Sequence, residues 1–439
     1  MTVAALGTGA VMAPAAHAQQ GVQPVREGES IQAAVDAAAE GGTVLVMPGT
    51  YRESVQITRN VTLRGMGAGR VTITAPAGQG AQAAPAAPGT APAAAPAAPD
   101  PSAPAAGRPM APQGSAPAAP EAGRPAAPAA TPDGTAPAAA QAETGTTAMP
   151  AQTGTATTQA AANADTGTAT TATMTQAACA AAGHGICVTG ADGHPLTAVR
   201  IESISVVGFR KNGIDVSGTD RMVVRRVEVK NNGEQGISQE KSTRAVLRDN
   251  EAVGNGQSGI FVANFVNAEG GALDTRGTVV AGNTLTGNRI GVTIRRARVL
   301  TVENNTVTGN CGGVFVVGDE NSPKAGDLDI RQNRITDNNK FCASNGRLPA
   351  IQGTGVLLTG AEDTRITGNT ITGNSGTSPM SGGVVLFPSE VGVANQRDQV
   401  SGNTLSGNSP ADLADRDTKG SGNTFSANSC SVSEPAGRC

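Results

Sequence analysis

Arginines recur at one position of a repeated unit in the second half of this chain. Each stands seven residues before an asparagine that closes a unit, and a glutamate, Glu303, occupies the same position in one unit. The set is Arg225, Arg248 and Arg331, with Arg295 and Arg296 at the end of a neighbouring strand. A guanidinium group binds a carboxylate through two parallel hydrogen bonds. The set therefore predicts a surface for acidic sugars; the alternative is a solvated face with ion pairs such as Arg331 with Glu303.

A second group of candidate binding residues lies beside three long loops at one corner of the repeats. The loops are Asn264–Gly277, Gly318–Asp327 and Pro388–Asp398. Stacked loops would wall a cleft in which Asp274 and Asp319 supply acids and Phe261 and Phe315 stack on sugar rings. The alternative is that the loops simply cover these two phenylalanines.

Catalytic residues do not emerge from the outward positions two residues after each repeat start. These are Cys187, Asp215, Ser238, Phe261, Thr293, Phe315, Leu357 and Val385. One acid is neither a calcium cluster nor the carboxylate pair of a glycosidase. His184 and His194 flank Cys187, but two scattered ligands without CxxC spacing do not define a metal site. We therefore expect no metal and no cofactor, and the catalytic residues stay unknown.

The element that must position these side chains is a repeat beginning with glycine and an aliphatic residue. The starts are Gly185, Gly213, Gly236, Gly259, Gly291, Gly313, Gly355 and Gly383, at spacings of 28, 23, 23, 32, 22, 42 and 28 residues. A minimum period with insertions is typical of a solenoid. Aliphatic residues follow each start at alternate positions, and two further aliphatic stretches lie before each closing asparagine. Three inward stretches per turn predict a three-sheet parallel β-helix, right-handed by the usual handedness of parallel β connections.

Asparagines recur as pairs that close each turn. The pairs are Asn250/Asn255, Asn283/Asn288, Asn305/Asn310, Asn333/Asn338, Asn369/Asn374, Asn403/Asn408 and Asn423/Asn428. Asparagine amides bond to local backbone and, when stacked in register, to one another. We interpret these columns as structural ladders rather than as sugar-binding residues.

Composition divides the chain into four segments. Residues 1–18 resemble a signal peptide that is cleaved after Ala16-His17-Ala18, which predicts a secreted, periplasmic or cell-surface protein. Residues 19–75 form an N-terminal cap, with a helix beginning at Ser30, and the first coil. Residues 76–178 consist mainly of Ala, Pro, Thr, Gly and Gln, which predicts a disordered insertion. Residues 179–439 form the main β-helix.

Six cysteines in an exported chain indicate disulfides, with about 15 possible connectivities. Cys311 and Cys342 follow the closing asparagines of two successive coils, so they lie one layer apart, at a distance that suits a bridge. We choose local pairs for the remaining four. These are Cys179 with Cys187 and Cys430 with Cys439.

A formal net charge of −3 argues against binding to nucleic acid by bulk electrostatics. No apolar run approaches the length of a membrane span. We expect a monomer.

Several motifs in both expected folded parts resemble the pectate-lyase-like superfamily, in particular its carbohydrate-binding and sugar-hydrolase branch. They are Ser30–Ala38, Gly42–Tyr51, Asn60–Gly65 and the Gly-Asn-Thr-aliphatic-Thr-Gly-Asn coils. The resemblance implies a right-handed parallel β-helix and a polysaccharide ligand held along one outer face. This superfamily includes lyases, hydrolases, epimerases, adhesins and a periplasmic copper-maturation protein.

The function expected from the sequence is recognition of an acidic polysaccharide on the arginine-bearing face, with cleavage or epimerisation left open. If the protein is an enzyme, it is a polysaccharide lyase, epimerase or glycoside hydrolase. The alternative is a non-catalytic adhesin or structural spacer without a binding site. The enzyme requires a carboxylate pair, or a cation beside an acid, within one cleft.

Overall fold

The computed structural model describes residues 21–78, 80, 175–191, 193–264, 270–345 and 348–439. The expected signal peptide and most of the expected insertion lie outside these residues, so both stay predictions. The described part of the chain resumes with helix α2 (Gln176–Ala182), which begins inside the last residues assigned to the insertion.

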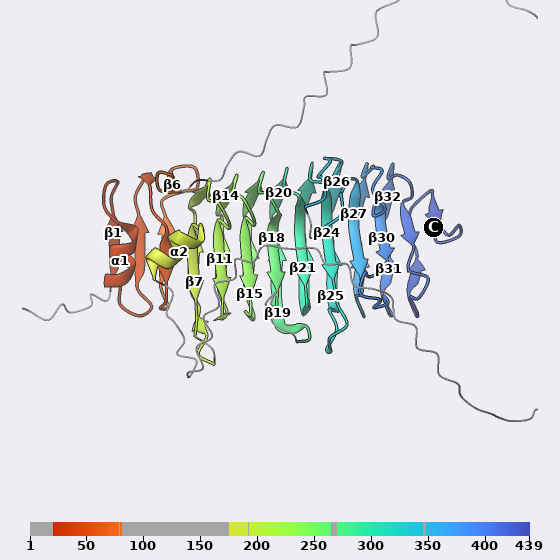
Figure 1. The fold of residues 1–439 in the computed structure, drawn as a ribbon, viewed down its shortest axis with the longest axis horizontal. Coiled ribbons are helices and arrows are strands. Elements are labelled where there is room, and N and C mark those ends of the chain that lie inside the picture. Colours follow the sequence, from red (N-terminus) through yellow and green to blue (C-terminus); the bar gives the residue numbers. More distant parts are fainter. Residues whose placement is uncertain (1–20, 79, 81–174, 192, 265–269, 346–347) are drawn as a thin grey trace, which may run out of the picture. The chain divides into compact units, whose positions relative to one another are not determined.

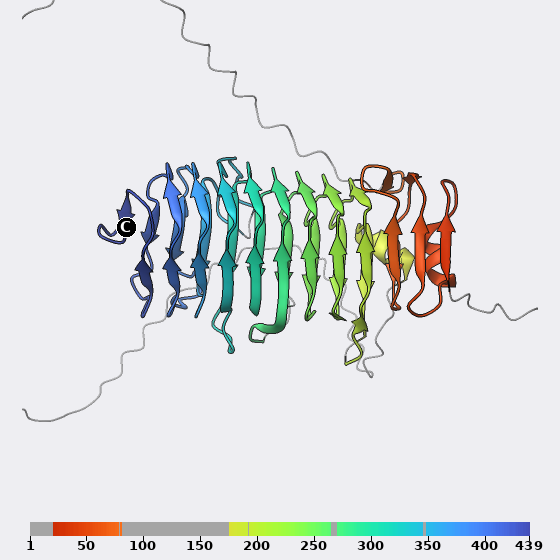
Figure 2. The same cartoon turned by 180° about the vertical axis from the view of Figure 1, so that it is seen from behind.

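The strands stack into three parallel sheets, which we name the arginine, threonine and front sheets; Figure 1 views the front sheet and Figure 2 the other two. The arginine sheet contains β1 (Val22–Val25), β2 (Thr43–Val46), β5 (Thr62–Gly65), β9 (Arg200–Glu202), β13 (Val223–Arg225), β16 (Val246–Arg248), β19 (Leu273–Ala281), β22 (Ala297–Glu303), β25 (Gly326–Arg331), β28 (Arg365–Thr367), β31 (Gln399–Ser401) and β34 (Thr424–Ser426). The threonine sheet contains β3 (Gly49–Tyr51), β6 (Val71–Thr74), β10 (Ser205–Val207), β14 (Glu228–Lys230), β17 (Glu251–Val253), β20 (Thr284–Thr286), β23 (Thr306–Thr308), β26 (Arg334–Thr336), β29 (Thr370–Thr372) and β32 (Thr404–Ser406). The front sheet contains β4 (Val55–Ile57), β7 (Ile186–Thr189), β11 (Ile214–Ser217), β15 (Ile237–Glu240), β18 (Ser258–Ala263), β21 (Ile290–Arg295), β24 (Gly312–Val317), β27 (Thr354–Thr359), β30 (Gly382–Phe387), β33 (Leu413–Asp415) and β35 (Ser433–Glu434). A short pair, β8 (Leu196–Thr197) and β12 (Thr219–Asp220), stands apart.

The core is the stack of inward aliphatic columns that the repeat predicts. Ile260, Leu247 and Leu285, one from each sheet of neighbouring coils, are at most 1% exposed. Gln239 is the polar member of its column and is buried as well. Because the same side chains recur at each level, every coil buries its apolar face against the next, which confirms the predicted three-sheet parallel β-helix.

The N-terminal end of this core is closed by helix α1 (Ile31–Ala37). Ser30 caps the helix, since its hydroxyl accepts a hydrogen bond from the Ala33 N–H at 3.2 Å. Ile31 and Val35 lie on one helical face and are buried in the core. The expected capping helix is therefore confirmed.

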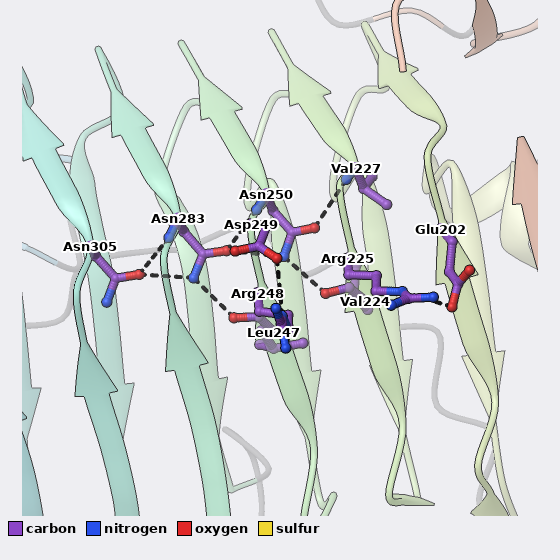
Figure 3. A network of polar contacts seen from close by, with 10 residues as sticks. All are labelled: Glu202, Val224, Arg225, Val227, Leu247, Arg248, Asp249, Asn250, Asn283 and Asn305. Carbon is purple, nitrogen blue, oxygen red and sulfur yellow. Dashed lines mark hydrogen bonds and ion pairs between the residues drawn. The ribbon is translucent and has the colours of Figure 1, made fainter. Parts of the chain in front are cut away.

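Two asparagine ladders hold successive coils together. Asn250 donates from its amide to Asn283 Oδ1 at 3.0 Å, and Asn283 donates to Asn305 Oδ1 at 2.9 Å (Figure 3). A parallel ladder includes Asn288 and Asn310, with 3.1 Å between Nδ2 and Oδ1. The same amides also donate to backbone carbonyls of the preceding coil, for example Asn283 to Leu247 at 2.9 Å. The structural interpretation of these columns is confirmed.

The last coil differs from the sequence-based alignment. Asn428 accepts from Asn403 and so continues the first ladder, whereas Asn423 accepts from the Asp398 N–H at a different corner. Phe425 pairs with Val400 in the arginine sheet, although the asparagine spacing assigns it to the next sheet. The assignment of the last asparagine pair is therefore wrong, because Asn423 and Asn428 flank β34 of the arginine sheet, whereas the earlier pairs flank strands of the threonine sheet.

The six cysteines form three disulfides, Cys179–Cys187, Cys311–Cys342 and Cys430–Cys439. These are the pairs that the sequence analysis chose. The first two are attached to the front sheet, one at β7 and one at the start of β24.

Candidate functional site

The arginine sheet carries paired rather than isolated arginines. Arg225 donates from Nε to one oxygen of Glu202 at 2.9 Å (Figure 3). Arg64 donates from Nε to the other oxygen at 2.8 Å, and the Glu202 side chain is fully buried. Burial alone would raise the pKa of Glu202, but the hydrogen bonds from Arg225 and Arg64 outweigh it, and the pKa is lowered. This cluster has the character of a structural ion triad.

Two further outward arginines of this sheet are paired as well. Arg248 lies 3.0 Å from Asp249, and Arg331 lies 2.7 Å from Glu303. The second contact is the cross-strand pair that the sequence analysis weighed against a binding surface. Arg225, Arg248 and Arg331 therefore present their charges together with carboxylates.

Arg225→Ala should destabilise the protein rather than impair a binding site. The change leaves the buried Glu202 carboxylate with Arg64 alone, at an expected cost of about 2 kcal/mol in the free energy of unfolding. Arg248→Ala breaks only a half-exposed ion pair, so it should change the free energy of unfolding by no more than about 0.5 kcal/mol. Chemical denaturation measures both, and equal effects would contradict the buried triad.

The loops at the front-to-arginine corner also use their acids locally. Asp319 forms an ion pair with Arg296, and both side chains are largely buried. Asp274 accepts the Arg276 N–H at 2.7 Å within a turn. Neither Asp274 nor Asp319 lines the cleft described next.

A cleft of about 720 Å³ opens on the outer face of the front sheet. Its floor and sides include Ser238 and Glu240 of β15, Phe261 of β18, Thr293 and Arg295 of β21, and Phe315 of β24. A volume of this size falls within the range of ordinary small-ligand sites. The structure thus brings together three of the sequence-predicted residues, Phe261, Phe315 and Arg295, and separates them from the rest.

Glu240 is the distinctive group of this cleft. Within the described part of the chain, its half-buried carboxyl group has no hydrogen-bond or ion-pair partner, unlike the carboxylates of the arginine sheet. Burial raises the pKa of Glu240 to about 7, and the negative charge of Asp215 adds to this effect. A carboxyl group that titrates near neutral pH within a cleft is suited to general acid–base chemistry.

Two further polar residues, Asp215 and His184, lie on the N-terminal side of Glu240, at the same face of the front sheet. Asn212 donates from Nδ2 to Asp215 at 2.7 Å, and its backbone N–H donates to His184 Nδ1 at 3.2 Å. The second bond assigns the proton of the neutral ring to Nε2. Burial lowers the pKa of His184, although Asp215 opposes the shift, so this imidazole is uncharged at neutral pH.

Arg295 is the cation of the cleft. In the register of the front sheet, Glu240 pairs with Ala263 and Ala263 pairs with Arg295. Two strand spacings place the Glu240 and Arg295 backbones about 10 Å apart, with a small side chain between them. Both side chains point outward from this row, and the positive charge of Arg295 acts on the Glu240 carboxyl group.

The two phenylalanines form walls rather than exposed stacking platforms. Phe261 is 9% exposed and Phe315 is 2% exposed. Phe315 belongs to a second hydrophobic cluster on the outer face of the front sheet, with Ile351 and Leu357. Phe315 is therefore covered, but by a different loop from the three that the sequence pointed to.

The loop that covers Phe315 is described at residues 339–345 and 348–353, and its Asn345 and Leu348 also line the cleft. The Cys311–Cys342 disulfide ties it to β24. Arg289 holds it as well, donating to the carbonyls of Ala343 at 2.7 Å and Pro349 at 3.0 Å. This loop lies at the threonine-to-front corner, opposite to the corner proposed from the sequence.

Glu240 is not among the residues singled out from the sequence, because those came from the outward positions two residues after each repeat start. The position four residues after the start faces outward too, and it reads Thr189, Ser217, Glu240, Ala263, Arg295, Val317, Thr359 and Phe387. An acid and an arginine two coils apart, with alanine between them, is the signal that would have found the site.

Neither a metal site nor a membrane span is evident in the residues that the structure describes. They contain no cluster of three or more His, Cys, Asp or Glu side chains arranged for a metal ion. They also contain no helix that is long and apolar enough to span a bilayer.

Comparison with known proteins supports the fold class. The family described as "Right handed beta helix region" matches residues 166–326, and the family described as "Periplasmic copper-binding protein (NosD)" matches residues 264–434. No curated protein matches the chain.

Among solved structures, the A-module of mannuronan C-5 epimerase AlgE6 from Azotobacter vinelandii is similar, with 17% identity, a TM-score of 0.51, and coverage of 91% of this chain and 88% of that chain. The AlgE4 A-module from the same organism shows 17% identity and a TM-score of 0.49 over 91% and 90% of the two chains. The periplasmic alginate epimerase AlgG shows 14% identity and a TM-score of 0.43 over 56% and 55%. Likeness at these identities concerns the fold alone.

The chain is a right-handed parallel β-helix with the pectate-lyase-like fold. Its sheet topology, the family match to residues 166–326 and the likeness to the AlgE6 A-module agree on the β-helix fold.

Proposed function

We propose that this protein binds an acidic polysaccharide in the front-sheet cleft and removes a proton beside a uronate carboxylate. In this proposal Arg295 holds the carboxylate and Glu240 is the base. The observation that carries the proposal is Glu240 itself: a partnerless carboxyl group among the described residues, with a pKa of about 7, in one cleft with an arginine.

The chemistry requires only these two roles at the first step. The Glu240 carboxylate takes the proton from C5 of the uronate, and the electron pair left on C5 delocalises into the carboxyl group. Arg295 offsets the negative charge that develops there. If the electron pair expels the oxygen on C4, which takes a proton from water, an unsaturated uronate and a shortened chain result. If water instead delivers a proton to the opposite face of C5, the C5 epimer results.

Ionisation of Glu240 suits this role at neutral pH. A base whose pKa lies near the working pH is present in its active form and still accepts a proton readily. Lyases and epimerases share this first step, so the cleft supports both. The adhesin or spacer alternative does not require a half-buried carboxyl group with a raised pKa within a cleft.

Export is part of the same proposal. The three disulfides fit an oxidising compartment, and the family with the printed description "periplasmic copper-binding protein" matches the C-terminal half. A secreted or periplasmic location agrees with the A-x-A pattern at residues 16–18, which lies outside the described residues.

Arg295→Ala should weaken binding of mannuronan or polygalacturonate about 10- to 100-fold, because a charged hydrogen-bond donor to the carboxylate is lost. Calorimetric titration measures the dissociation constant, and the carboxylate-free polymer mannan tests whether the lost affinity belongs to the carboxylate. Arg248→Ala is the matched control, since Arg248 is an outward arginine paired with Asp249 on another sheet.

The control should bind as the wild type does. Loss of binding in Arg248→Ala with full binding in Arg295→Ala would move the site to the arginine sheet. Absence of binding to every uronate polymer, together with no unsaturated or epimerised product by ultraviolet absorbance and NMR, would refute the proposed function.

A further inference from the structure

Building on the proposed function, we infer that three stacked arginines at the front-to-arginine corner form a second binding site for the uronate chain, beside the site at Arg295. We name Arg221, Arg244 and Arg276 the arginine ladder. None of the three lines the cleft. The inference rests on the register of this corner, on the small number of carboxylates around it, and on the absence of apolar and aromatic side chains from its described surface.

The three arginines occupy equivalent positions in successive coils. The Arg221 N–H donates to the Thr243 carbonyl at 2.9 Å, and the Arg244 N–H donates to the Thr275 carbonyl at 2.7 Å, so each arginine stacks on the next. All three adopt a positive φ, of 57°, 52° and 54°, where the chain turns the corner. At the usual strand spacing, Arg221 and Arg276 lie about 10 Å apart along the solenoid axis.

One buried acid is shared within the ladder. Asp220, whose side chain is 8% exposed, accepts hydrogen bonds from Arg244 Nε at 2.7 Å and from Arg244 Nη2. Arg221 Nε lies 4.0 Å from the same carboxylate, and the Arg221 side chain is 62% exposed. Arg276 is exposed, and its side chain has no hydrogen-bond or ion-pair partner among the described residues. Asp220 therefore compensates Arg244, whereas Arg221 and Arg276 present their charges to solvent.

The surroundings of the ladder are basic as well. Residues 218–227, 241–250 and 272–282 form the corner and the arginine sheet in these coils, and they contain seven lysines and arginines and three acids. Two further acids of neighbouring segments, Glu202 and Glu269, leave the cations in excess, although Glu269 lies outside the described residues. The corner therefore attracts an anionic ligand.

The spacing of the ladder fits a uronate chain. In an extended 1,4-linked chain, each sugar is turned by about half a turn from the one before it, so the carboxylates on one side belong to every second sugar. Two sugars are about as long as two coils, so these carboxylates meet Arg221 and Arg276. A guanidinium group binds each carboxylate through two parallel hydrogen bonds.

Other anionic partners fit the described surface less well. Its exposed large apolar residues are Val22, Met66, Phe341, Val391 and Val432, and none of them lies in the three coils of the ladder, so a lipid surface finds no apolar anchor there. The three segments that form the corner and the arginine sheet in these coils also contain no aromatic residue on which a nucleobase could stack.

The ladder lies on the Glu240 side of the cleft. Strand β15 ends at Glu240, and the chain reaches Arg244 after one short turn. A uronate chain that is bound to the ladder therefore stays beside the cleft, which raises its effective concentration at Arg295.

The test compares mannuronan with its disaccharide. Arg221→Gln/Arg276→Gln removes the two uncompensated charges and should weaken binding of mannuronan about 10-fold at low salt, with a smaller loss at high salt. Dimannuronate is too short to reach both arginines, so its affinity should equal that for the wild type. Calorimetric titration at two salt concentrations measures both ligands, and the trisaccharide should be the shortest chain that distinguishes the two proteins.

Two matched variants separate the ladder from a general effect of charge. Arg221→Lys/Arg276→Lys keeps the charges but loses the planar guanidinium groups, so it should recover only part of the affinity. Arg334→Gln removes an exposed arginine of β26 on the threonine sheet, which has no ion pair among the described residues, and should bind mannuronan as the wild type does.

The outcomes distinguish the inference from the proposed function. Wild-type affinity for mannuronan in the double glutamine variant, together with weaker binding in Arg295→Ala, would overturn the ladder and leave the proposed function intact. A similar loss for the disaccharide, or in Arg334→Gln, would also overturn it. No binding of any uronate by the wild type would refute the proposed function, and the ladder with it.

Discussion

Glu240→Gln should lower kcat/KM for uronate conversion about 100- to 10,000-fold, the usual contribution of a general base. The glutamine keeps the shape of the side chain but cannot accept the C5 proton. Binding of a uronate oligosaccharide should persist or strengthen, because a like charge near the ligand carboxylate is removed. Parallel measurement of turnover and of the dissociation constant separates these effects.

The matched control is Glu234→Gln, the other acid that lines the cleft. Glu234 is paired with Lys211, so its loss should change turnover only slightly. Equal losses in the two variants, or a loss of binding that accounts for the whole effect of Glu240→Gln, would contradict the role of Glu240 as base.

The pH profile provides a check with a definite sign. Since the carboxylate is the active form, turnover should rise with pH through the Glu240 pKa of about 7. Asp215→Asn removes the like charge that helps to raise this pKa, so the rising limb should move to lower pH. Burial is the larger cause and is retained, so the limb should stay above the ordinary range for glutamate. An unmoved limb would show that another group titrates.

Asp398→Asn should stabilise the protein at pH 7 by about 3 kcal/mol. Asp398 is fully buried at a corner of the solenoid, and burial raises its pKa to about 8. Its Oδ1 accepts the Thr364 N–H at 3.0 Å, while Oδ2 has no partner among the described residues. An asparagine keeps the acceptor, and its amide can donate to Asn423 Oδ1 as the ladder asparagines do.

The sign follows from proton linkage. The folded protein holds the Asp398 proton up to about pH 8, whereas the unfolded chain releases it near the model value of 3.8. Stability from this group is therefore fully present below about pH 4 and is lost as pH rises towards 8. Asp398→Asn should remove this decline. Thermal unfolding at pH 5 and pH 8 measures it, and the loss of stability between the two pH values should be smaller in the variant than in the wild type.

Asp412→Asn is the opposite control. Asp412 is also buried, but both of its oxygens accept hydrogen bonds, from Asn408 Nδ2 at 2.9 Å and from the Ser431 N–H at 3.0 Å. An amide nitrogen in place of one oxygen would face a donor and destabilise the protein. Stabilisation by both variants, or by neither, would contradict the hydrogen bonds assigned to these two side chains.

Much of the fold could be predicted from the sequence, because its repeat spacings follow from the geometry of strands and corners. Aliphatic residues at alternate positions point to one side of a strand, so Val292 and Ile294 had to share the interior. Asparagines stacked at corners bond to one another, as Asn283 and Asn305 do. The last coil escaped this reasoning because the spacing before Asn423 does not reveal which corner it turns.

The candidate site was only partly readable. Arg295 was singled out for its chemistry, but Arg225 and Arg248 were singled out equally, and only Arg295 lines the cleft. Glu202 is 23 residues before Arg225 and pairs with it across the sheet. The loop that walls the cleft belongs to the 42-residue spacing between Gly313 and Gly355, which contains two insertions at different corners.

The sequence by itself determined the solenoid, its inward columns and its asparagine corners, because these depend on contacts between equivalent positions of successive repeats. Only the tertiary structure decided which outward charges are paired, which phenylalanine is covered, and where a cleft remains open. Those outcomes depend on contacts between insertions of unequal length that lie over the sheet. Such contacts do not recur with the repeat, so the repeat spacing does not predict them. For that reason Glu240, which ordinary spacing leaves unremarked, became the centre of the proposed site.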